Sequence, residues 1–196
     1  MRLYYIRHGL TDWNQAGRLQ GQRDTPINQT GRAEAAVCGE ILRDLFARDD
    51  RAATDLDYVS SPLARARETM EIVRAMLKLP QECYAVDQRL AEIAFGEWEG
   101  LTYAEVMQRD PDVVARREAD KWGFVPPGGE NYKMVAARVG AWYASLTRDT
   151  VATAHGGTAR ALVAYLGIAA HEEAVHQEID QGVVYVFENN TLARYG

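Results

Sequence analysis

Two short strand-like runs, far apart in the chain, end in the same way. The first, Leu3–Ile6, continues into Arg7-His8-Gly9, and the second, Val151–Ala154, continues into His155-Gly156. A mainly apolar run without glycine or proline is typical of a buried strand. A charged side chain and an imidazole at the end of such a strand are costly unless they face a cleft. The repeated ending therefore predicts two strands that bring two imidazoles to one crevice.

Candidate helices occur at intervals along the rest of the chain. One is expected from residue 31, because apolar residues at every fourth position form a stripe, namely Ala33, Val37, Ile41 and Leu45. Another is expected to open at Ser61-Pro62, which fits an N-cap followed by proline at the first helical position. Shorter or weaker patterns indicate helices over 103–108, 111–118, 135–146 and 158–166.

Candidate strands separate these helices. They are expected at 56–60, 83–86, 172–179 and 183–187, and Asp180–Gly182 is expected to join the last two as a hairpin. Strands that alternate with helices indicate an α/β fold with a mainly parallel sheet, which the hairpin makes mixed. The expected architecture is a three-layer α/β/α sandwich.

Length and composition favour a single domain over residues 1–196. A chain of 196 residues with 47% hydrophobic content can bury one substantial core. The irregular segment 102–130 is expected to be a lid-like excursion, because it is too short for a core of its own. No apolar run approaches the roughly 20 residues that span a bilayer, and no signal-peptide pattern is present. We expect no membrane association and a monomer or homodimer.

The net charge of −6 argues against a general affinity for nucleic acid or anionic membranes. A bound anion must then be held by local positive charge. Cys38 and Cys83 are expected to be buried thiols rather than a disulfide, which fits the cytoplasm. His171 and His176 are five residues apart and do not share a helical face, so no metal site is expected.

Several candidate groups converge on the predicted crevice. Ligands of open α/β sheets lie beyond the carboxyl ends of the strands. One strand end supplies Arg7 and His8, a second leads to Arg65 in the following helix, and a third supplies His155 with the Gly156 backbone. Two arginines, two histidines and two helix N-termini describe an anion site that suits a phosphoryl group.

The chain offers no serine or cysteine in a recognisable nucleophile motif, but an imidazole can attack phosphorus itself. The attacking imidazole must be neutral, and nearby arginines lower its pKa. The leaving alcohol needs a proton, for which Glu92 is the first candidate, with Glu97 and Glu99 as rivals in the same loop. Arg65 has a rival reading as a surface ion-pair residue, because Arg67 is near it.

These residues resemble the histidine phosphatase (phosphoglycerate mutase-like) superfamily. Arg7-His8-Gly9, followed by Thr11, Trp13 and Asn14, resembles its signature. The resemblance continues in the family's order through Asp24–Asn28, Ser60–Thr69, Arg89–Glu92, Phe95–Gly100, Gly128–Glu130 and Ala154–Gly157. One such triplet is weak support, whereas an ordered set across essentially the whole chain is very specific.

The resemblance implies a role for each residue. His8 is expected to carry the phosphoryl group, Arg7, Arg65 and His155 to stabilise the transition state, and Glu92 to act as proton donor and then as base. Thr11, Asn14, Gln20, Gly21 and Gly156 are the residues expected to bind phosphate or substrate. No metal or nucleotide cofactor is implied, and the expected partner is a small phosphorylated substrate. Gln20 and Ala91 depart from residues that many relatives carry on the substrate side.

The branch of the superfamily sets the expected reaction. Phosphoglycerate mutases carry an insertion between the proton donor and the second histidine, and this interval is short here. The stretch Phe95–Gly100 resembles phosphatases, including α-ribazole phosphatase-like, broad-specificity and fructose-2,6-bisphosphatase-like members. We therefore expect a phosphomonoester hydrolase. The alternatives are a cofactor-dependent mutase and a silent phospho-ligand sensor, although no catalytic residue is lost.

Two further points are left open by the sequence. Trp98, Trp122 and Phe124 either contact substrate or pack in the interior. The segment 103–129 is expected to shape the leaving-group side of the site.

Overall fold

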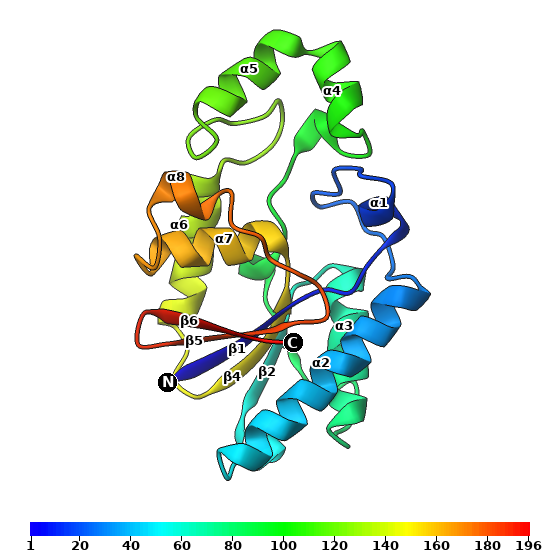
Figure 1. Cartoon of the computed structure of the whole chain (residues 1–196), viewed down its shortest axis with the longest axis vertical. Coiled ribbons are helices and arrows are strands. Elements are labelled where there is room, and N and C mark those ends of the chain that lie inside the picture. Colours follow the sequence, from blue (N-terminus) through cyan, green and yellow to red (C-terminus); the bar gives the residue numbers. More distant parts are fainter.

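A six-stranded sheet forms the centre of the protein in the computed structural model, which describes all 196 residues (Figure 1). Its strand order is β3-β2-β4-β1-β5-β6. The strands are β1 (Arg2–Arg7), β2 (Asp57–Ser60), β3 (Ala85–Val86), β4 (Thr150–Ala154), β5 (Val184–Glu188) and β6 (Thr191–Tyr195). The first four are mutually parallel, whereas β5 and β6 are antiparallel to their neighbours. The predicted mixed, mainly parallel α/β fold is confirmed.

The helices lie on both faces of the sheet and at one end of it (Figure 1). They are α1 (Asp12–Gln15), α2 (Gln29–Arg48), α3 (Ala64–Met76), α4 (Tyr103–Arg109), α5 (Pro111–Ala119), α6 (Tyr132–Ala144), α7 (Gly156–Tyr165) and α8 (His171–Ala174). Short 3₁₀ turns occupy Ala53–Asp55, Gln88–Leu90 and Gly96–Trp98.

Alternate residues of β1 pack into two separate cores. Tyr4 and Ile6 join an apolar cluster with α2 and α3, whereas Leu3 and Tyr5 join a larger cluster with α6, α7 and α8. Side chains on a strand point alternately to opposite faces, so a strand that is apolar throughout must be covered on both sides. The sheet is therefore the middle of three layers, as expected.

The pairing of β1 with β4 places the two histidines together. Arg7 lies opposite Ala154 in the parallel register, and the backbone N–H of His8 donates to the Ala154 carbonyl at 2.9 Å. Residues that follow two adjacent parallel strands emerge at the same edge of the sheet. Gly9 then passes so close to α2 that a Cβ there would collide with the Gly31 backbone. The close packing keeps the end of β1 at the head of that helix.

Helix α2 faces the sheet along a different line from the predicted stripe. The residues buried in its middle include Ala35, Cys38 and Leu42, whereas Ala33 is exposed and the Val37 side chain is 44% exposed. A strict four-residue step turns about 40° further around the helix at each repeat. A stripe drawn that way leaves the buried face at its start, and only its last two members meet the core: Leu45 is buried there and Ile41 packs against it, partly buried.

Three other local predictions were wrong. Helix α3 begins after Leu63, so Ser61 is not its N-cap, and the Ser61 hydroxyl bonds to His155 instead. The stretch 172–179 is not a strand, because α8 occupies its first part. The last hairpin turns at Asn189-Asn190, where both φ angles are positive, and not at 180–182. Asparagine tolerates that conformation, so this pair was the overlooked turn signal, and β6 was missed with it.

The segment 102–130 projects from one end of the molecule, where α4 and α5 lie above the sheet in Figure 1. Val106 and Val114 pack there against Trp98, whose ring stacks on Phe124 at 5.9 Å between centroids. Trp122 stacks on His171 at 4.1 Å. These three aromatic side chains therefore pack against other residues.

Two further observations complete the fold. None of the helices is long and apolar enough to cross a membrane. Cys38 and Cys83 are both free thiols, and Cys83 is exposed, which corrects the expectation that both are buried.

Candidate active site

A cavity of about 150 Å³ opens beyond the carboxyl ends of β1 and β4. Of the residues predicted for the site, those that line it are Arg7, His8, Asn14, Gln20, Gly21, Arg65, Glu92 and Gly156. His155 lies beside His8, with 5.2 Å between the ring centroids, but is fully buried. Thr11 is also fully buried and does not line the cavity.

The His8 imidazole is held in one tautomer by its own backbone. Nδ1 lies 2.8 Å from the carbonyl oxygen of Gly9, and a carbonyl only accepts, so Nδ1 carries the proton. The lone pair is then on Nε2. Burial, followed by the charges of Arg65 and Arg7, lowers the pKa of His8 well below its ordinary value. His8 is therefore a neutral imidazole with a free electron pair.

Arg7 and Arg65 place two guanidinium groups at the cavity without a carboxylate partner. Arg7 donates from Nη1 to the Ile179 carbonyl at 2.7 Å, and Arg65 donates from Nη2 to the Gly21 carbonyl at 2.7 Å. The Nε–H of each is buried and has no partner. Buried cations without a counter-charge are costly, so the arrangement suits a bound anion.

The alternative interpretation of Arg65 as a surface ion-pair residue is wrong. Arg65 is fully buried at the second position of α3, whereas Arg67 is exposed, with its Nε 3.4 Å from the Tyr84 hydroxyl.

The backbone around His155 is fixed by two hydroxyl groups. Its N–H donates to Thr158 Oγ1 at 3.1 Å, and its carbonyl accepts from the Tyr5 hydroxyl at 2.7 Å. The side chain lies 2.7 Å from Ser61 Oγ through Nε2, while Nδ1 has no partner. Burial and the charge of Arg65 lower the pKa of His155 well below its ordinary value.

Ser61 was overlooked as a member of the site because its position before proline suggested a helix cap. A serine bonded to a histidine could act as a nucleophile, but Ser61 is fully buried and does not line the cavity. Its hydroxyl accepts from the Leu63 N–H at 3.4 Å, and His155 Nε2, 2.7 Å from Oγ, is the acceptor within reach of its own hydrogen. Ser61 thus orients the imidazole and leaves Nδ1–H as the free donor.

Glu92 reaches the cavity from the loop after β3. Its Oε1 accepts from the Ile93 N–H at 2.9 Å, and its Oε2 accepts from the Gly157 N–H at 3.2 Å. A Cβ at Gly157 would collide with Oε1, so only glycine leaves room for the carboxylate there. The rivals do not reach the cavity: Glu97 is exposed, and Glu99 accepts from the Gln22 and Phe95 N–H groups.

An ion pair braces the loop that carries Glu92. Arg138, on α6, donates to three carbonyls of this loop, those of Arg89 at 2.7 Å, Ala91 at 2.6 Å and Glu92 at 3.1 Å. It also pairs with Glu130 at 2.9 Å, and Glu130 in turn accepts from the Ala94 N–H at 3.1 Å. Sequence reasoning missed Arg138, and the only signal was the family-like Gly128–Glu130 stretch.

The loop after β1 is organised from behind the cavity wall. Thr11 caps α1 by accepting from the Asn14 N–H at 3.1 Å and donates to Gln20 Oε1 at 3.0 Å. Gln181 bridges the His8 carbonyl at 3.0 Å and Asn14 Oδ1 at 3.3 Å. Thr11 therefore positions the lining residues from outside the cavity, and Gln181 is a further contact that the sequence did not suggest.

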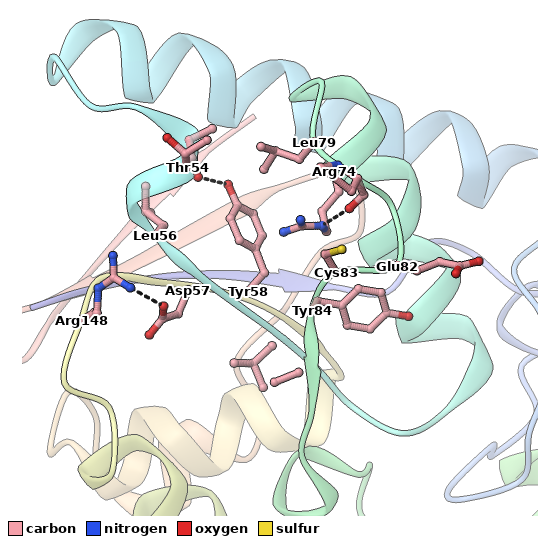
Figure 2. Close-up of a pocket in the computed structure, with 14 residues that line it drawn as sticks. Thr54, Leu56, Asp57, Tyr58, Arg74, Leu79, Glu82, Cys83, Tyr84 and Arg148 are labelled. Atoms are coloured by element: carbon pink, nitrogen blue, oxygen red, sulfur yellow. Dashed lines mark hydrogen bonds and ion pairs between the residues drawn. The ribbon is translucent and has the colours of Figure 1, made fainter.

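A larger hollow of the molecule lies elsewhere, at the β2–β3 edge of the sheet (Figure 2). It measures about 850 Å³ and contains no histidine. Arg148 pairs with Asp57 at 2.9 Å, and Arg74 donates to the Pro80 carbonyl at 2.8 Å while lying over the Tyr58 ring. Both cations are already engaged, so this hollow lacks the free donors of the smaller cavity. No group of three or more His, Cys, Asp or Glu side chains in the molecule could hold a metal ion.

Comparison with known proteins identifies the family. A family model described as "Histidine phosphatase superfamily (branch 1)" matches residues 3–191. The chain belongs to the histidine phosphatase superfamily. It is 36% identical to the glucosyl-3-phosphoglycerate phosphatase of Mycobacterium tuberculosis, over 84% of this chain and 74% of that protein. It is also 30% identical to a 2,3-bisphosphoglycerate-dependent phosphoglycerate mutase of Gloeobacter violaceus, over 95% of this chain and 85% of that one.

Solved structures agree with this assignment. The α-ribazole phosphatase of Shigella flexneri superposes with a TM-score of 0.80 at 27% identity and covers 98% of this histidine phosphatase and 93% of its own chain. The expected family and fold are confirmed. The protein is an enzyme of the histidine phosphatase type that acts on a small phosphorylated metabolite.

Proposed function

We propose that this histidine phosphatase hydrolyses a phosphomonoester through a covalent phosphohistidine on His8, without a metal ion. One observation carries the proposal: a neutral imidazole with its lone pair on Nε2 lies beside two guanidinium groups that form no ion pair within the protein. A phosphoryl dianion can pair with both, and its phosphorus is the electrophile that Nε2 can attack.

In the first step, the N–H groups of Arg7 and Arg65 bind the phosphoryl oxygens. Nε2 of His8 attacks phosphorus, and the bond from phosphorus to the ester oxygen breaks. The protonated carboxyl of Glu92 donates its proton to that leaving oxygen. The free Nδ1–H of His155 is a further donor for charge on the transferring group, and its neutral ring adds no competing positive charge.

In the second step, the phosphoryl group passes from His8 to water. The Glu92 carboxylate removes a proton from the attacking water, so it returns to the protonated form in which it began. The bond from Nε2 to phosphorus breaks, inorganic phosphate leaves, and His8 is again a neutral imidazole. The Gly9 carbonyl accepts from Nδ1–H throughout, so it can support the positive charge that the ring carries while phosphorylated.

Hydrolysis is distinguished from phosphoryl transfer back to a sugar acid by the product. The relatives include both phosphatases and mutases, so a cofactor-dependent phosphoglycerate mutase is the alternative. We expect no 2-phosphoglycerate when the protein is given 3-phosphoglycerate with catalytic 2,3-bisphosphoglycerate. Isomer formation that outpaces phosphate release would instead support the mutase.

The simplest test of the proposal uses p-nitrophenyl phosphate. The wild-type protein is expected to turn it over, His8→Asn to be inactive, and EDTA to leave the rate unchanged. Turnover by His8→Asn would count against the nucleophile, and a strong loss on chelation would count against metal independence. A total lack of turnover by the wild type on a panel of sugar, nucleotide and other monophosphates would favour a silent sensor.

A further inference from the structure

The cavity holds a third guanidinium group that the proposed mechanism does not use. Arg160, on α7, lines the cavity and has no carboxylate partner. Its Nε–H donates to the Gln177 carbonyl at 2.8 Å, which fixes the group while leaving its terminal nitrogens free. A Cβ added at Gly156 would lie 3.5 Å from Arg160 Nη1 and 3.6 Å from Arg7 Nε. The two guanidinium groups therefore flank the same stretch of backbone.

Two more groups lie next to Arg160. Tyr132 lines the same cavity from the start of α6, and its side chain is close enough to feel the charge of Arg160. Lys121 belongs to the projecting 102–130 segment. Burial, followed by the charges of Arg117 and Arg160, lowers the pKa of Lys121, so this ammonium lies among other cations. Its Nζ is 3.5 Å from His176 Nδ1. Lys121 does not itself line the cavity, but His176 is followed by Gln177, whose carbonyl binds Arg160, so the ammonium lies behind Arg160.

When the charges of the reactive complex are counted, no anion remains to pair with Arg160 and Lys121. Arg7 and Arg65 balance the phosphoryl dianion. Glu92 must be protonated to donate, so it contributes no negative charge at that moment. Arg18, the remaining arginine of the cavity wall, pairs with Glu105 at 3.2 Å. A partly desolvated cation gains most from a partner of opposite charge, and Arg160 finds none within the protein.

We infer that Arg160, with the Tyr132 hydroxyl and Lys121, forms a second anion subsite, and that the leaving group of the substrate carries a carboxylate or a second phosphoryl group. This inference rests on the proposed function, because it describes the part of the substrate that departs. It also gives the 102–130 segment a role, since Lys121 connects that segment to the chain that holds Arg160. In both cases the leaving group carries an anion a few bonds from the scissile phosphate.

The test compares 3-phosphoglycerate with sn-glycerol 3-phosphate as competitive inhibitors of p-nitrophenyl phosphate hydrolysis. The two differ in that a carboxylate replaces a hydroxymethyl group. The wild type is expected to bind 3-phosphoglycerate at least about tenfold more tightly, as for one charge-assisted hydrogen bond. In Arg160→Met the ratio of the two Ki values should fall to within about twofold. Glycerol 1,3-bisphosphate reports on a second phosphoryl group in the same way.

The controls separate failure of the subsite from failure of the proposed function. Arg43→Met removes an exposed arginine of α2, paired with Asp44 far from the cavity, and should keep the wild-type ratio. If Arg160→Met does not fold, by circular dichroism, Lys121→Met takes its place and should lower the ratio as well. Equal inhibition of an active wild type by all three compounds would overturn the subsite alone. If p-nitrophenyl phosphate is not hydrolysed at all, the proposed function fails, and calorimetric titration with the same three compounds still decides the subsite.

Discussion

The two walls of the active site are built in different ways. The nucleophile wall, His8 with His155, follows two adjacent parallel strands, so backbone hydrogen bonds of the sheet fix it. The donor wall is the irregular loop around Glu92, three of whose carbonyls accept from the Arg138 side chain. Many backbone hydrogen bonds hold the nucleophile wall, so the loss of one bond changes it little. The donor wall depends mainly on Arg138, so a single substitution can remove several of its bonds. We expect the donor wall to be the more easily disturbed.

The largest expected effect comes from removing the nucleophile. His8→Asn should lower kcat/KM for any phosphomonoester by at least about 10⁴-fold, as for loss of a covalent nucleophile. The loss should be the same for alkyl and aryl substrates, because both need the attacking nitrogen. Initial rates on p-nitrophenyl phosphate and sn-glycerol 3-phosphate measure it, with circular dichroism to show that the variant is folded. Retention of more than about one hundredth of the activity would mean that His8 is not the nucleophile.

Removing the proton donor should affect the two substrates unequally. Glu92→Gln keeps the size of the side chain but cannot donate a carboxyl proton, and we expect a loss of about 10²- to 10⁴-fold on sn-glycerol 3-phosphate. The loss of first-step rate on p-nitrophenyl phosphate should be smaller, because p-nitrophenolate leaves without a proton. Single-turnover rates on the two compounds check this. Equal losses would assign Glu92 to binding instead of proton transfer.

Replacing Arg138 should cause the same kind of defect as Glu92→Gln, but a smaller one. Arg138→Met removes the bonds to three loop carbonyls and leaves Glu130 unpaired, with 18% of its side chain exposed. We expect about 2–4 kcal/mol less stability by urea unfolding and the same preference for p-nitrophenyl phosphate that Glu92→Gln shows. Arg43→Met, which removes an arginine side chain of α2 that is 57% exposed, is the control. If Arg138→Met lowers the rates on both substrates equally, the effect of Arg138 is not confined to the donor wall.

The smallest expected effect is on the pH dependence of stability, and it reports on the nucleophile wall. Burial lowers the pKa of both His8 and His155. Below pH of about 6.5 the unfolded chain therefore binds protons that the folded protein does not, and stability falls as the pH drops. The slope should reach up to about 1.4 kcal/mol per pH unit for each histidine.

Urea unfolding between pH 5 and 7.5, without phosphate, measures this slope. His8→Asn should remove about half of the slope that the two histidines cause. A variant with an unchanged slope would show that His8 titrates normally in the folded protein.

The two walls also differ in how far the sequence predicted them. The nucleophile wall could be predicted because a strand that ends in Arg7-His8-Gly9 is a local sequence pattern, and a similar pattern recurs at His155. The same regularity gave the fold class. The partners that hold the histidines, such as Ser61 and Tyr5, lie far from them in the chain and left no such pattern.

The donor wall was less readable, because it depends on contacts made by irregular chain. Glu92 was the first candidate among three acidic residues of its loop, and the family resemblance then implied its role, whereas no local pattern revealed that Arg138 binds this loop. The same limit explains the misplaced stripe of α2, because α3 and the sheet decide which face of that helix is buried. The missed β6 has another cause, since it pairs with the preceding strand and its turn at Asn189-Asn190 was a local signal.

The phosphorylated intermediate provides the most direct test of the mechanism. The protein is mixed with a ³²P-labelled phosphomonoester, quenched within milliseconds in acid or in base, digested and examined by mass spectrometry. We predict label on the peptide that contains His8, stable in base and lost in acid, and no label in His8→Asn. An acid-stable label on the peptide of Ser61, or a label that persists in His8→Asn, would contradict the assignment of His8 as the nucleophile.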